Sequence, residues 1–447
     1  MNHNKPGLFG RLELAVEKYT PDPLVFAVFL TVIMLALVLL FTGAGPGGAL
    51  SAWGNGLHGL LAFTMQMCLM VVTAHVLAHT GPVEGFLQAV GRLPRNASQA
   101  YLVVILSAAA FSLACWPLGL IAGGLIAREV ASTASQRDIS INYPLLTAAA
   151  FGGFVVWEMG YSSSIGLAIA TPGNPLEQTI GGIIPVTETL LAWWNLLTII
   201  TTLTVVYLVV ILLATRKRSE QKVLPPQPMP KAGAGDEVRS GLMGRLEHGR
   251  SVSLLLALML LGFLVYWFST RGFELSLNIV NWSFLALGLL LARSVLHYSA
   301  LFADGARIAA PLLLQYPLYG GIMGLALETG LAQQVTNLVI MSSATESLPF
   351  TGFLSAGLVN IFIPSGGGQW AVQGPVFIQA AQALDVKLNL ITMSIAWGDQ
   401  WTNLVQPFCA IVILAITGLR LRQIYGYCCI ICLATAFPFI LGLWLAQ

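Results

Sequence analysis

The chain has 447 residues, of which 56% are hydrophobic and only 9% are charged, whereas a soluble domain carries roughly 25% Asp, Glu, Lys and Arg. This composition excludes a soluble fold, and the mean hydropathy of +0.79 fits repeated apolar stretches of about 20 residues, the length that crosses a bilayer. The net charge of +2 says little about partners, because in a polytopic membrane protein the position of each charge matters more than the sum.

Residues 1–23 form a charged amphipathic stretch that leads directly into an apolar segment, so we expect no cleavable signal peptide. Apolar length and breaking residues then predict seven membrane-spanning helices. These helices are expected at 24–42, 57–79, 188–214, 251–268, 278–293, 307–328 and 424–445.

Four other apolar regions are interrupted. Residues 144–171 and 389–419 begin as helices and then run into polar and Gly/Pro-rich sequence, which predicts broken helices. Segments 99–135 and 349–384 are apolar on both sides of a Gly/Pro tip, and their arms of about 15 residues are short for crossing a bilayer, which favours re-entrant hairpins. The expected fold is an all-α polytopic membrane protein with about nine spans, two re-entrant hairpins and two broken helices.

The distribution of basic residues tests this topology. With the N-terminus in the cytoplasm, all of the 21 Lys and Arg residues except Arg271 and Lys387 fall on the cytoplasmic side, as the positive-inside rule requires. If either hairpin were a single crossing, every later loop would change to the opposite side of the membrane, and the basic residues in those loops would no longer be cytoplasmic. The pattern therefore favours hairpins that return to the side they came from, with the C-terminus outside.

A polar, Pro-rich linker at 215–250 divides the chain into a first repeat, 24–214, and a region of an extra span and a second repeat, 251–447. At an offset of 249 residues, Gly56, Gln66, Thr80 and Gly81 align with Gly305, Gln315, Thr329 and Gly330, and Gly119 aligns with Gly368. Five crossings separate the first span from its counterpart. Because five is odd, the two repeats are expected to be inverted relative to each other.

Inverted repeats with broken helices are typical of secondary transporters, whose substrates bind near the midplane on half-helix ends. Helix N-termini offer unpaired N–H groups and a positive dipole end, which suit a carboxylate. Small residues at any one break can also serve helix packing alone, but four symmetric polar breaks favour a binding site. The candidate substrate-binding residues are Trp116, Gly119, Ser162, Ser163, Ser164, Thr171, Asn174, Asn360, Ser365, Gly366, Gly367, Gly368, Gln369, Trp370, Gln400, Trp401, Asn403 and Gln406.

Two acidic residues lie beside the unwound stretches, Glu158 and Asp399. Ionisable groups at membrane depth are costly and usually functional, so either residue could carry a coupling proton or help to hold a cation. No catalytic motif is expected, because Gly160-Tyr161-Ser162-Ser163 lacks the last glycine of a nucleophile elbow and Gly366-Gly367-Gly368 lacks the lysine of a phosphate-binding loop. We therefore expect no enzyme, no cofactor, no metal centre and no nucleic-acid partner.

Several polar strings at membrane depth resemble the bacterial short-chain fatty acid transporter family, which belongs to the ion-transporter superfamily of inverted-repeat carriers. The resemblance covers nearly the whole chain. It is carried by Pro21-Asp22-Pro23-Leu24, Leu61-Ala62-Phe63-Thr64-Met65-Gln66-Met67, Ala170-Thr171-Pro172-Gly173-Asn174-Pro175, Pro364-Ser365-Gly366-Gly367-Gly368-Gln369-Trp370, Gln373-Gly374-Pro375, Gln400-Trp401 and Gln406-Pro407-Phe408.

This resemblance implies uptake of short monocarboxylates such as acetoacetate or butyrate across the bacterial inner membrane, by symport with a proton or sodium ion. It also implies a homodimer formed through a scaffold. On the residues alone, we expect the carboxylate on the N–H groups of the hairpin tips and the aliphatic tail against Trp370 and Trp401. The alternatives are a sodium/proton antiporter or dicarboxylate carrier of similar architecture, and a membrane-embedded enzyme or receptor scaffold.

Overall fold

The structure is a computed structural model that describes residues 21–174, 176–216, 242–272, 277–341 and 344–447. The expected amphipathic N-terminus lies outside the described residues except for its last three positions, and so does most of the linker. The described end of the linker forms a short helix, α12 (Leu242–His248).

The elements of the described residues are helical throughout. The first half comprises α2 (Pro23–Phe41), α3 (Pro46–Gly59), α4 (Leu61–Ala78), α5 (Gly81–Arg92), α6 (Ala97–Ala114), α7 (Trp116–Gln136), α8 (Tyr143–Gly153), the 3-10 helix η1 (Phe154–Met159), α9 (Ser164–Ala170), α10 (Glu177–Ile180), η2 (Val186–Glu188) and α11 (Trp193–Arg216). The second half comprises α13 (Ser251–Arg271), α14 (Leu277–Leu291), α15 (Val295–Glu328), α16 (Leu331–Met341), α17 (Leu348–Asn360), α18 (Gly366–Ala383), α19 (Leu388–Thr402), α20 (Pro407–Thr417) and α21 (Leu421–Ala446).

Seven helices or helix pairs of the described chain are long and apolar enough to cross a membrane, and the bent pair α19–α20 makes an eighth. The all-α polytopic fold is thereby confirmed, while the count of nine spans stays a prediction. The arms of the first hairpin, α6 and α7, are longer than expected, with 18 and 21 residues, against 13 and 18 for α17 and α18 of the second hairpin. At 1.5 Å per residue, 18 residues reach about 27 Å, so re-entry of the first hairpin also stays a prediction.

The internal repeat is visible in the bounds of the helices. Adding 249 residues to the bounds of α5 gives 330–341, and α16 is Leu331–Met341. The same offset takes α6 and α7 to within about three residues of the bounds of α17 and α18. The same offset aligns α3 and α4 together with α15. The single helix α15 is continuous where the pair α3 and α4 is interrupted.

Local sequence explains where the helices restart. Ser163 and Ser365 are the N-cap residues of α9 and α18, and their hydroxyls accept hydrogen bonds from the amides of Gly166 and Gly368 at 2.9 and 3.2 Å. Pro407 stands at the start of α20, where a missing N–H costs nothing, and α20 is bent by 48° from α19.

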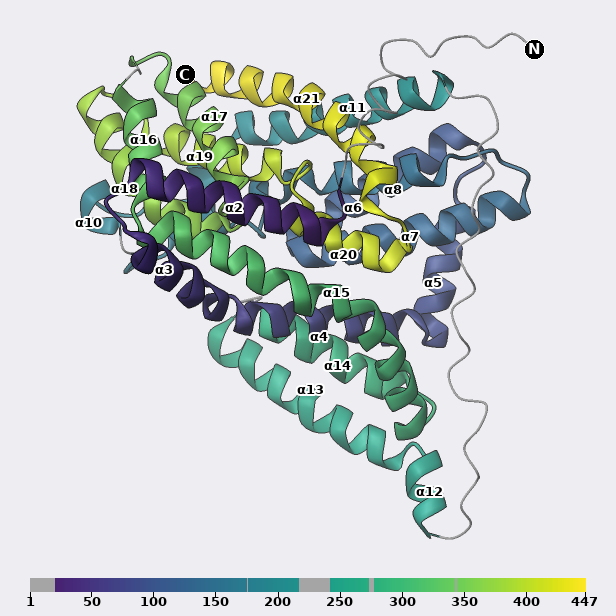
Figure 1. Ribbon diagram of the computed structural model, residues 1–447. Coiled ribbons are helices and arrows are strands. Elements are labelled where there is room, and N and C mark those ends of the chain that lie inside the picture. Colours follow the sequence, from purple (N-terminus) through teal and green to yellow (C-terminus); the bar gives the residue numbers. More distant parts are fainter. Residues whose placement is uncertain (1–20, 175, 217–241, 273–276, 342–343) are drawn as a thin grey trace.

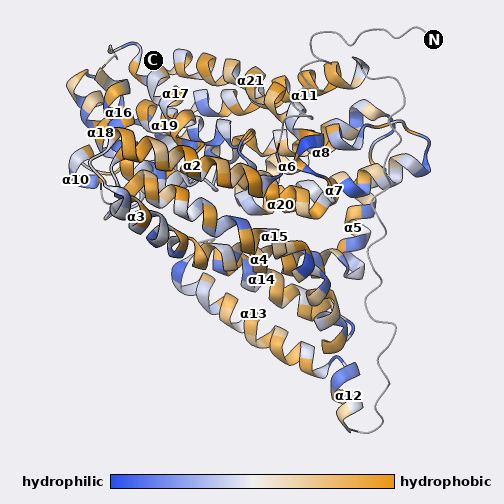
Figure 2. Cartoon of the chain, viewed as in Figure 1, coloured by the Kyte–Doolittle hydropathy of each residue, from blue (hydrophilic) through white to orange (hydrophobic). Residues whose placement is uncertain are grey.

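The helices form two packed groups (Figure 1). We call α3, α4, α13, α14 and α15 the scaffold; α13 and α14 lie at its outer edge in Figure 1 and α4 and α15 lie next to the rest of the molecule. The scaffold helices α3 and α15 approach closely, since a Cβ at Gly56 would meet the backbone of Gly320 and Gly324. Figure 2 shows a largely apolar α13, and Leu258 and Met259 on this helix are exposed, as expected for a surface that faces lipid.

The two hairpins approach from opposite ends of the molecule (Figure 1). Each is antiparallel: Gly119 and Gly123 of α7 pack on Ser112 and Ala108 of α6, and Gln369 of α18 donates to the carbonyl of Ala356 on α17 at 2.9 Å. The hairpins, the broken helices η1–α9 and α19–α20, and α8 form the second group, which we call the core group. The tips of both hairpins lie inside the molecule, beside the two breaks.

Candidate functional site

A cavity of about 140 Å³ lies where the two hairpin tips and the two broken helices meet. The core group contributes most of its wall, and α4 and α15 of the scaffold close it. Its lining residues are Leu60, Phe63, Trp116, Phe154, Trp157, Ser164, Met323, Pro364, Ser365, Gly366, Gly367, Asp399, Asn403, Phe408 and Cys409. Seven of these are residues that the sequence analysis selected: Trp116, Ser164, Ser365, Gly366, Gly367, Asp399 and Asn403.

The tip of the second hairpin presents free backbone donors to the cavity. Helix α18 begins at Gly366, and the amides of Gly366 and Gly367 donate to no other group of the described chain. The third amide, that of Gly368, is taken by the hydroxyl of Ser365. Two unpaired N–H groups at a helix N-terminus form a site for an anion.

The two tip glycines differ in their surroundings. A Cβ at Gly366 would meet the hydroxyl of Ser164 and the Oε1 atom of Glu158, whereas a Cβ at Gly367 would meet nothing within 4 Å. Gly366 is therefore required for close approach of the tip to the first broken helix. At Gly367 the space that a side chain would take is empty, and this residue lines the cavity.

The tip of the first hairpin has less to offer an anion. The amide of Trp116 donates to the Oγ of Ser162 at 2.6 Å, and Pro117 has no N–H. Ser162 in turn donates its own amide to the carbonyl of Leu113 at 3.0 Å. These bonds fasten the first tip to the first broken helix and use its first amide, which we expected to face a carboxylate.

Glu158 is fully buried and its carboxylate is surrounded by donors. Its Oε2 accepts from the hydroxyl of Ser163 at 2.6 Å and the amide of Ile165 at 3.3 Å, and its Oε1 accepts from the hydroxyl of Ser164. These donors belong to the first turn of α9, whose positive dipole end also favours a negative charge. The backbone amide of Glu158 donates to the Oε1 of Gln400 at 2.7 Å, which ties the two broken helices together.

Asp399 has the opposite surroundings. Its side chain is 1% exposed and lines the cavity, and neither carboxylate oxygen has a hydrogen-bond partner among the described residues. A Cβ built at Gly366 would lie 3.4 Å from the Oδ2 of Asp399 and would also contact Glu158. The two carboxyl groups therefore flank the same glycine at the second tip, where like charges repel.

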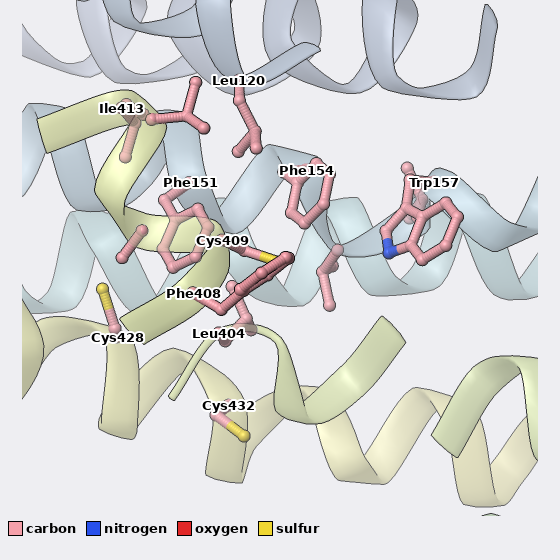
Figure 3. Packing of buried hydrophobic residues seen from close by; sticks show 14 of the residues in the cluster. Leu120, Phe151, Phe154, Trp157, Leu404, Phe408, Cys409, Ile413, Cys428 and Cys432 are labelled. Carbon is pink, nitrogen blue, oxygen red and sulfur yellow. The ribbon is translucent and has the colours of Figure 1, made fainter. Parts of the chain in front are cut away.

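The rest of the cavity wall is aromatic. The ring centroid of Phe63 on α4 lies 6.1 Å from Trp116 and 6.0 Å from Phe408, and Trp116 lies 5.8 Å from Trp157. Figure 3 shows Phe154 and Trp157 beside each other, with Phe408 and Cys409 on the neighbouring element. Asn403 holds this wall in place, because its Oδ1 accepts from the indole N–H of Trp157 at 2.9 Å. The cavity thus has an apolar side and a polar end.

Several predicted residues lie outside the cavity wall. Thr171 and Asn174 form a surface turn after α9, in which Asn174 donates to the carbonyl of Thr171 at 3.0 Å. Trp370 is buried away from the cavity, and the indole N–H of Trp401 donates to the carbonyl of Cys432 at 2.6 Å. Neither tryptophan lines the cavity. The aromatic residues that do line it are others than the two expected to contact the substrate tail.

The remaining predicted residues support the hairpins and breaks. Asn360 donates to the hydroxyl of Thr402 at 2.9 Å, and Gln369 joins α18 to α17. Gly119 allows the close packing of α7 on α6. Gln406 is the N-cap residue of α20 and its side-chain amide has no partner in the described chain.

Most of the apolar wall carries no signal that predicts it from the sequence. Phe63 stands in a string that carries the family resemblance, but nothing in that string indicates which of its residues faces the core group. Phe154 and Trp157 are three residues apart, the period of the 3-10 helix η1, and this spacing is the signal that could have identified one aromatic face. Met323 and Leu60 give no local signal, because they reach the site only through packing of the scaffold.

Comparison with known proteins gives a consistent result. The family model described as short chain fatty acid transporter matches residues 8–446. A protein of Escherichia coli K12 named "Putative short-chain fatty acid transporter" is 36% identical over 432 residues, which is 96% of this chain and 97% of that protein. A protein of Haemophilus influenzae Rd with the same name is 34% identical over 438 residues, again 96% and 97% of the two chains.

These matches run across both repeats and include the hairpin tips and breaks that form the cavity. They indicate a transporter and not an enzyme. The resemblance seen in the sequence is confirmed, and this multi-pass membrane protein belongs to the short-chain fatty acid transporter family.

Proposed function

We propose that the protein is a secondary active transporter that takes up short monocarboxylates, such as butyrate or acetoacetate, by symport with a proton or a sodium ion. The observation that carries this proposal is the cavity itself. It joins two free helix N-terminal amides, an unpartnered carboxyl group and an aromatic wall at the junction of both repeats.

The carboxylate of the substrate is placed on the amides of Gly366 and Gly367. These donors are supported by the dipole of α18, an 18-residue helix. The Trp116 amide of the first tip is already used by Ser162, so the second tip, with two free amides, is the better anchor. The aliphatic tail then points toward Phe63, Trp116 and Phe408.

Cation coupling follows from the charges around this anchor. An anionic substrate would enter beside Asp399, which has no donor to compensate its own charge, and close to Glu158. A third negative charge is unfavourable there unless a proton or cation enters as well. Symport with a cation makes the two binding events depend on each other.

The size of the cavity favours short acids. Its volume of about 140 Å³ is below the roughly 300–1,000 Å³ of pockets for drug-sized ligands. No Arg, Lys or His occurs among the described residues of its lining, which argues against a dicarboxylate, since a second carboxylate would need a positive charge or donors beyond the two tip amides. The sodium/proton antiporter is the weaker alternative, because it leaves the aromatic wall without a role.

Uptake by purified protein in proteoliposomes tests the function. We expect labelled butyrate and acetoacetate to accumulate under an imposed proton or sodium gradient, and unlabelled acids of up to about four carbons to compete better than succinate or octanoate. Phe63→Ala enlarges the tail side and should improve competition by hexanoate and octanoate about tenfold relative to butyrate. Phe86→Ala, at an exposed position of α5, is the matched control. Movement of sodium and protons without any monocarboxylate would contradict the proposal.

The orientation in the membrane is part of the proposal. The positive-inside distribution supports an N-terminus in the cytoplasm, and the relatives in Escherichia coli and Haemophilus influenzae support the bacterial inner membrane. Single cysteines at Arg92 and Lys387 in a cysteine-free variant should react with an impermeant reagent from opposite sides. Reaction from the same side would contradict the proposed topology.

A further inference from the structure

Asn403 is the one side-chain amide in the described wall of the cavity at the hairpin tips, which we call the substrate cavity. It follows the last residue of α19, at the break before α20. Its side chain is 3% exposed, so its polar atoms are almost fully withdrawn from bulk solvent. Their hydrogen bonds must come from the protein or from a molecule in the cavity.

A tryptophan fixes the orientation of this amide. The indole N–H of Trp157 can only donate, and it donates to the Oδ1 atom of Asn403 at 2.9 Å. A reversed amide would place two donors against each other, so the oxygen faces Trp157. The Nδ2 atom, on the other branch of the amide, keeps two N–H groups for another acceptor.

No group of the described chain accepts from these N–H groups, since the Nδ2 atom of Asn403 forms no hydrogen bond there. Gln400 and Gln406 belong to the same broken helix and also have an unpartnered Nε2, but those atoms are fully buried and neither residue lines the cavity. The Nδ2 atom of Asn403 is not among the fully buried atoms, and its residue lines the cavity. It is therefore a donor that a molecule in the cavity can reach.

Asn195 shows what a structural amide of the same kind does. Its Oδ1 likewise accepts the indole N–H of a tryptophan, that of Trp397 at 3.2 Å. Its Nδ2, however, donates to the carbonyls of Met159 and Leu190 at 3.0 and 2.7 Å, and Asn195 does not line the substrate cavity. The two amides share the contact with tryptophan and differ in the donor, which is used in Asn195 and free in Asn403.

The cavity wall itself does not supply an acceptor for this donor. The hydroxyl of Ser164 is bonded to Glu158, and that of Ser365 caps α18. The carboxylate of Asp399 has no hydrogen-bond partner in the described chain, so Asn403 does not reach it in this arrangement. The acceptor therefore has to come from what enters the cavity.

The donor stands on the aromatic side of the cavity. Asn403 is bonded to Trp157, and the ring centroid of Trp157 lies 5.8 Å from that of Trp116. The free amides of Gly366 and Gly367 stand at the polar end. An acid whose carboxylate is held by the two tip amides thus extends its carbon chain toward the side on which Asn403 lies.

We propose that Asn403 is a specificity-determining residue, whose Nδ2 donates to an oxygen atom on the carbon chain of the substrate. The preferred substrate is then a short monocarboxylate with a carbonyl or hydroxyl oxygen beyond its carboxylate, such as acetoacetate or 3-hydroxybutyrate. An unsubstituted acid such as butyrate leaves the amide unpaired, and a site built around a donor rejects a ligand that lacks the acceptor. The inference rests on the proposed function for the transport of short monocarboxylates.

The test is competition for uptake into proteoliposomes of the full-length protein. Acetoacetate, 3-hydroxybutyrate and butyrate have the same number of carbons and one carboxylate each, and differ only in the group at the third carbon. Each unlabelled acid is titrated against labelled acetoacetate, and uptake by protein-free liposomes is subtracted. We expect the wild type to prefer acetoacetate over butyrate about fivefold to twentyfold, with 3-hydroxybutyrate between them.

Two variants remove the donor. Asn403→Leu has a similar size and no N–H, so the preference for acetoacetate should fall to within about twofold, because acetoacetate binds more weakly while butyrate binds about as before. Asn403→Ser changes the packing in another way, and its shorter side chain should lose the preference as well. The midpoint of thermal denaturation in detergent shows that each variant is folded.

The matched control is Asn195→Leu, which removes an indole-bonded amide outside the substrate cavity. It should lower the midpoint of thermal denaturation and the uptake of both acids without changing their ratio. An unchanged preference in both Asn403 variants would overturn the inference, because the amide would then serve only Trp157 or a water molecule. The same loss of preference in the Asn195 variant would also overturn it.

The result also separates this inference from the proposed function. A wild-type protein that takes up butyrate and acetoacetate equally well contradicts the role of Asn403 alone. A wild-type protein that takes up no monocarboxylate under any gradient contradicts the proposed function and the role of Asn403 together.

Discussion

The two repeats supply matching elements to the substrate cavity but different chemistry. In the first repeat, Ser162 occupies the tip amide of Trp116, and Glu158 has three donors around its carboxylate. In the second repeat, the amides of Gly366 and Gly367 are free and Asp399 is unpartnered. A repeated backbone thus provides the place for a site, and on the proposed function its side chains leave substrate and ion binding to the second half.

The largest effect is expected from blocking the second tip. Gly367→Val places a branched side chain in the open space beside the free amides, so we expect loss of both uptake and exchange of butyrate, by at least about 100-fold, with normal insertion and abundance. Gly262→Val on α13, where a Cβ also meets nothing within 4 Å, is the control. Transport with normal affinity in the Gly367 variant would mean that the second tip is not the anchor.

The next effect concerns energy coupling. Asp399→Asn removes the unpartnered charge, and we expect butyrate to reach no higher concentration inside than outside under a gradient. If the coupling ion is a proton, the variant mimics the protonated state and exchange of labelled for unlabelled butyrate continues; if it is sodium, exchange falls as well, because the cation loses a ligand. Asp385→Asn, at an exposed position outside the cavity, is the control. Normal accumulation by the Asp399 variant would remove this residue from coupling.

Glu158→Gln should have a different effect from Asp399→Asn. Its carboxylate is an acceptor for three donors, and an amide can replace only one of the two oxygens. We therefore expect a loss of about 1–3 kcal/mol in the free energy of unfolding, measured as a lower midpoint of thermal denaturation in detergent. Butyrate uptake should fall as the stability falls. The ratio of butyrate accumulation to butyrate exchange should remain that of the wild type. A stable variant that only loses accumulation would assign Glu158 and Asp399 the same role.

The smallest effect is expected at the first tip. Ser162→Ala removes the hydrogen bond to the amide of Trp116 at a cost of about 1 kcal/mol, and uptake should fall about twofold to fivefold. Ser283→Ala on α14, which removes a hydroxyl bonded to the carbonyl of Ile279, is the control. A rise in affinity for butyrate would show that the freed amide can serve as an anchor, and would weaken the contrast between the two repeats.

The sequence was informative about the position of the breaks and about the repeat. Hairpin tips and broken helices are marked by proline, glycine and polar residues within apolar segments, and these are local signals. The offset of 249 residues found in the sequence reappears in the bounds of the helices. The arm lengths of the first hairpin were underestimated, because Ala and Gly continue α6 and α7 beyond the most apolar stretch.

The sequence was less informative about which residues of the breaks meet. It selected Trp370 and Trp401 for the tail of the substrate, whereas Trp116, Phe63 and Phe408 line the cavity. A tryptophan next to a break faces the cavity or the helices behind it according to its helical phase, and a break changes that phase. Phe63 and Met323 come from helices far from the tips in sequence.

The sequence by itself determined an all-helical membrane protein, its duplicated halves, its four breaks and its family, because hydropathy, breaking residues and recurring strings act locally or in order along the chain. Only the tertiary structure decided that the first tip is occupied by Ser162 and the second is free, and that Glu158 is paired while Asp399 is not. The bond at the first tip joins residues 46 positions apart, and Glu158, whose carboxylate has its donors five to seven residues away, is tied to the second broken helix across 242 positions. Which donors remain free after folding depends on packing, and the sequence alone does not show it.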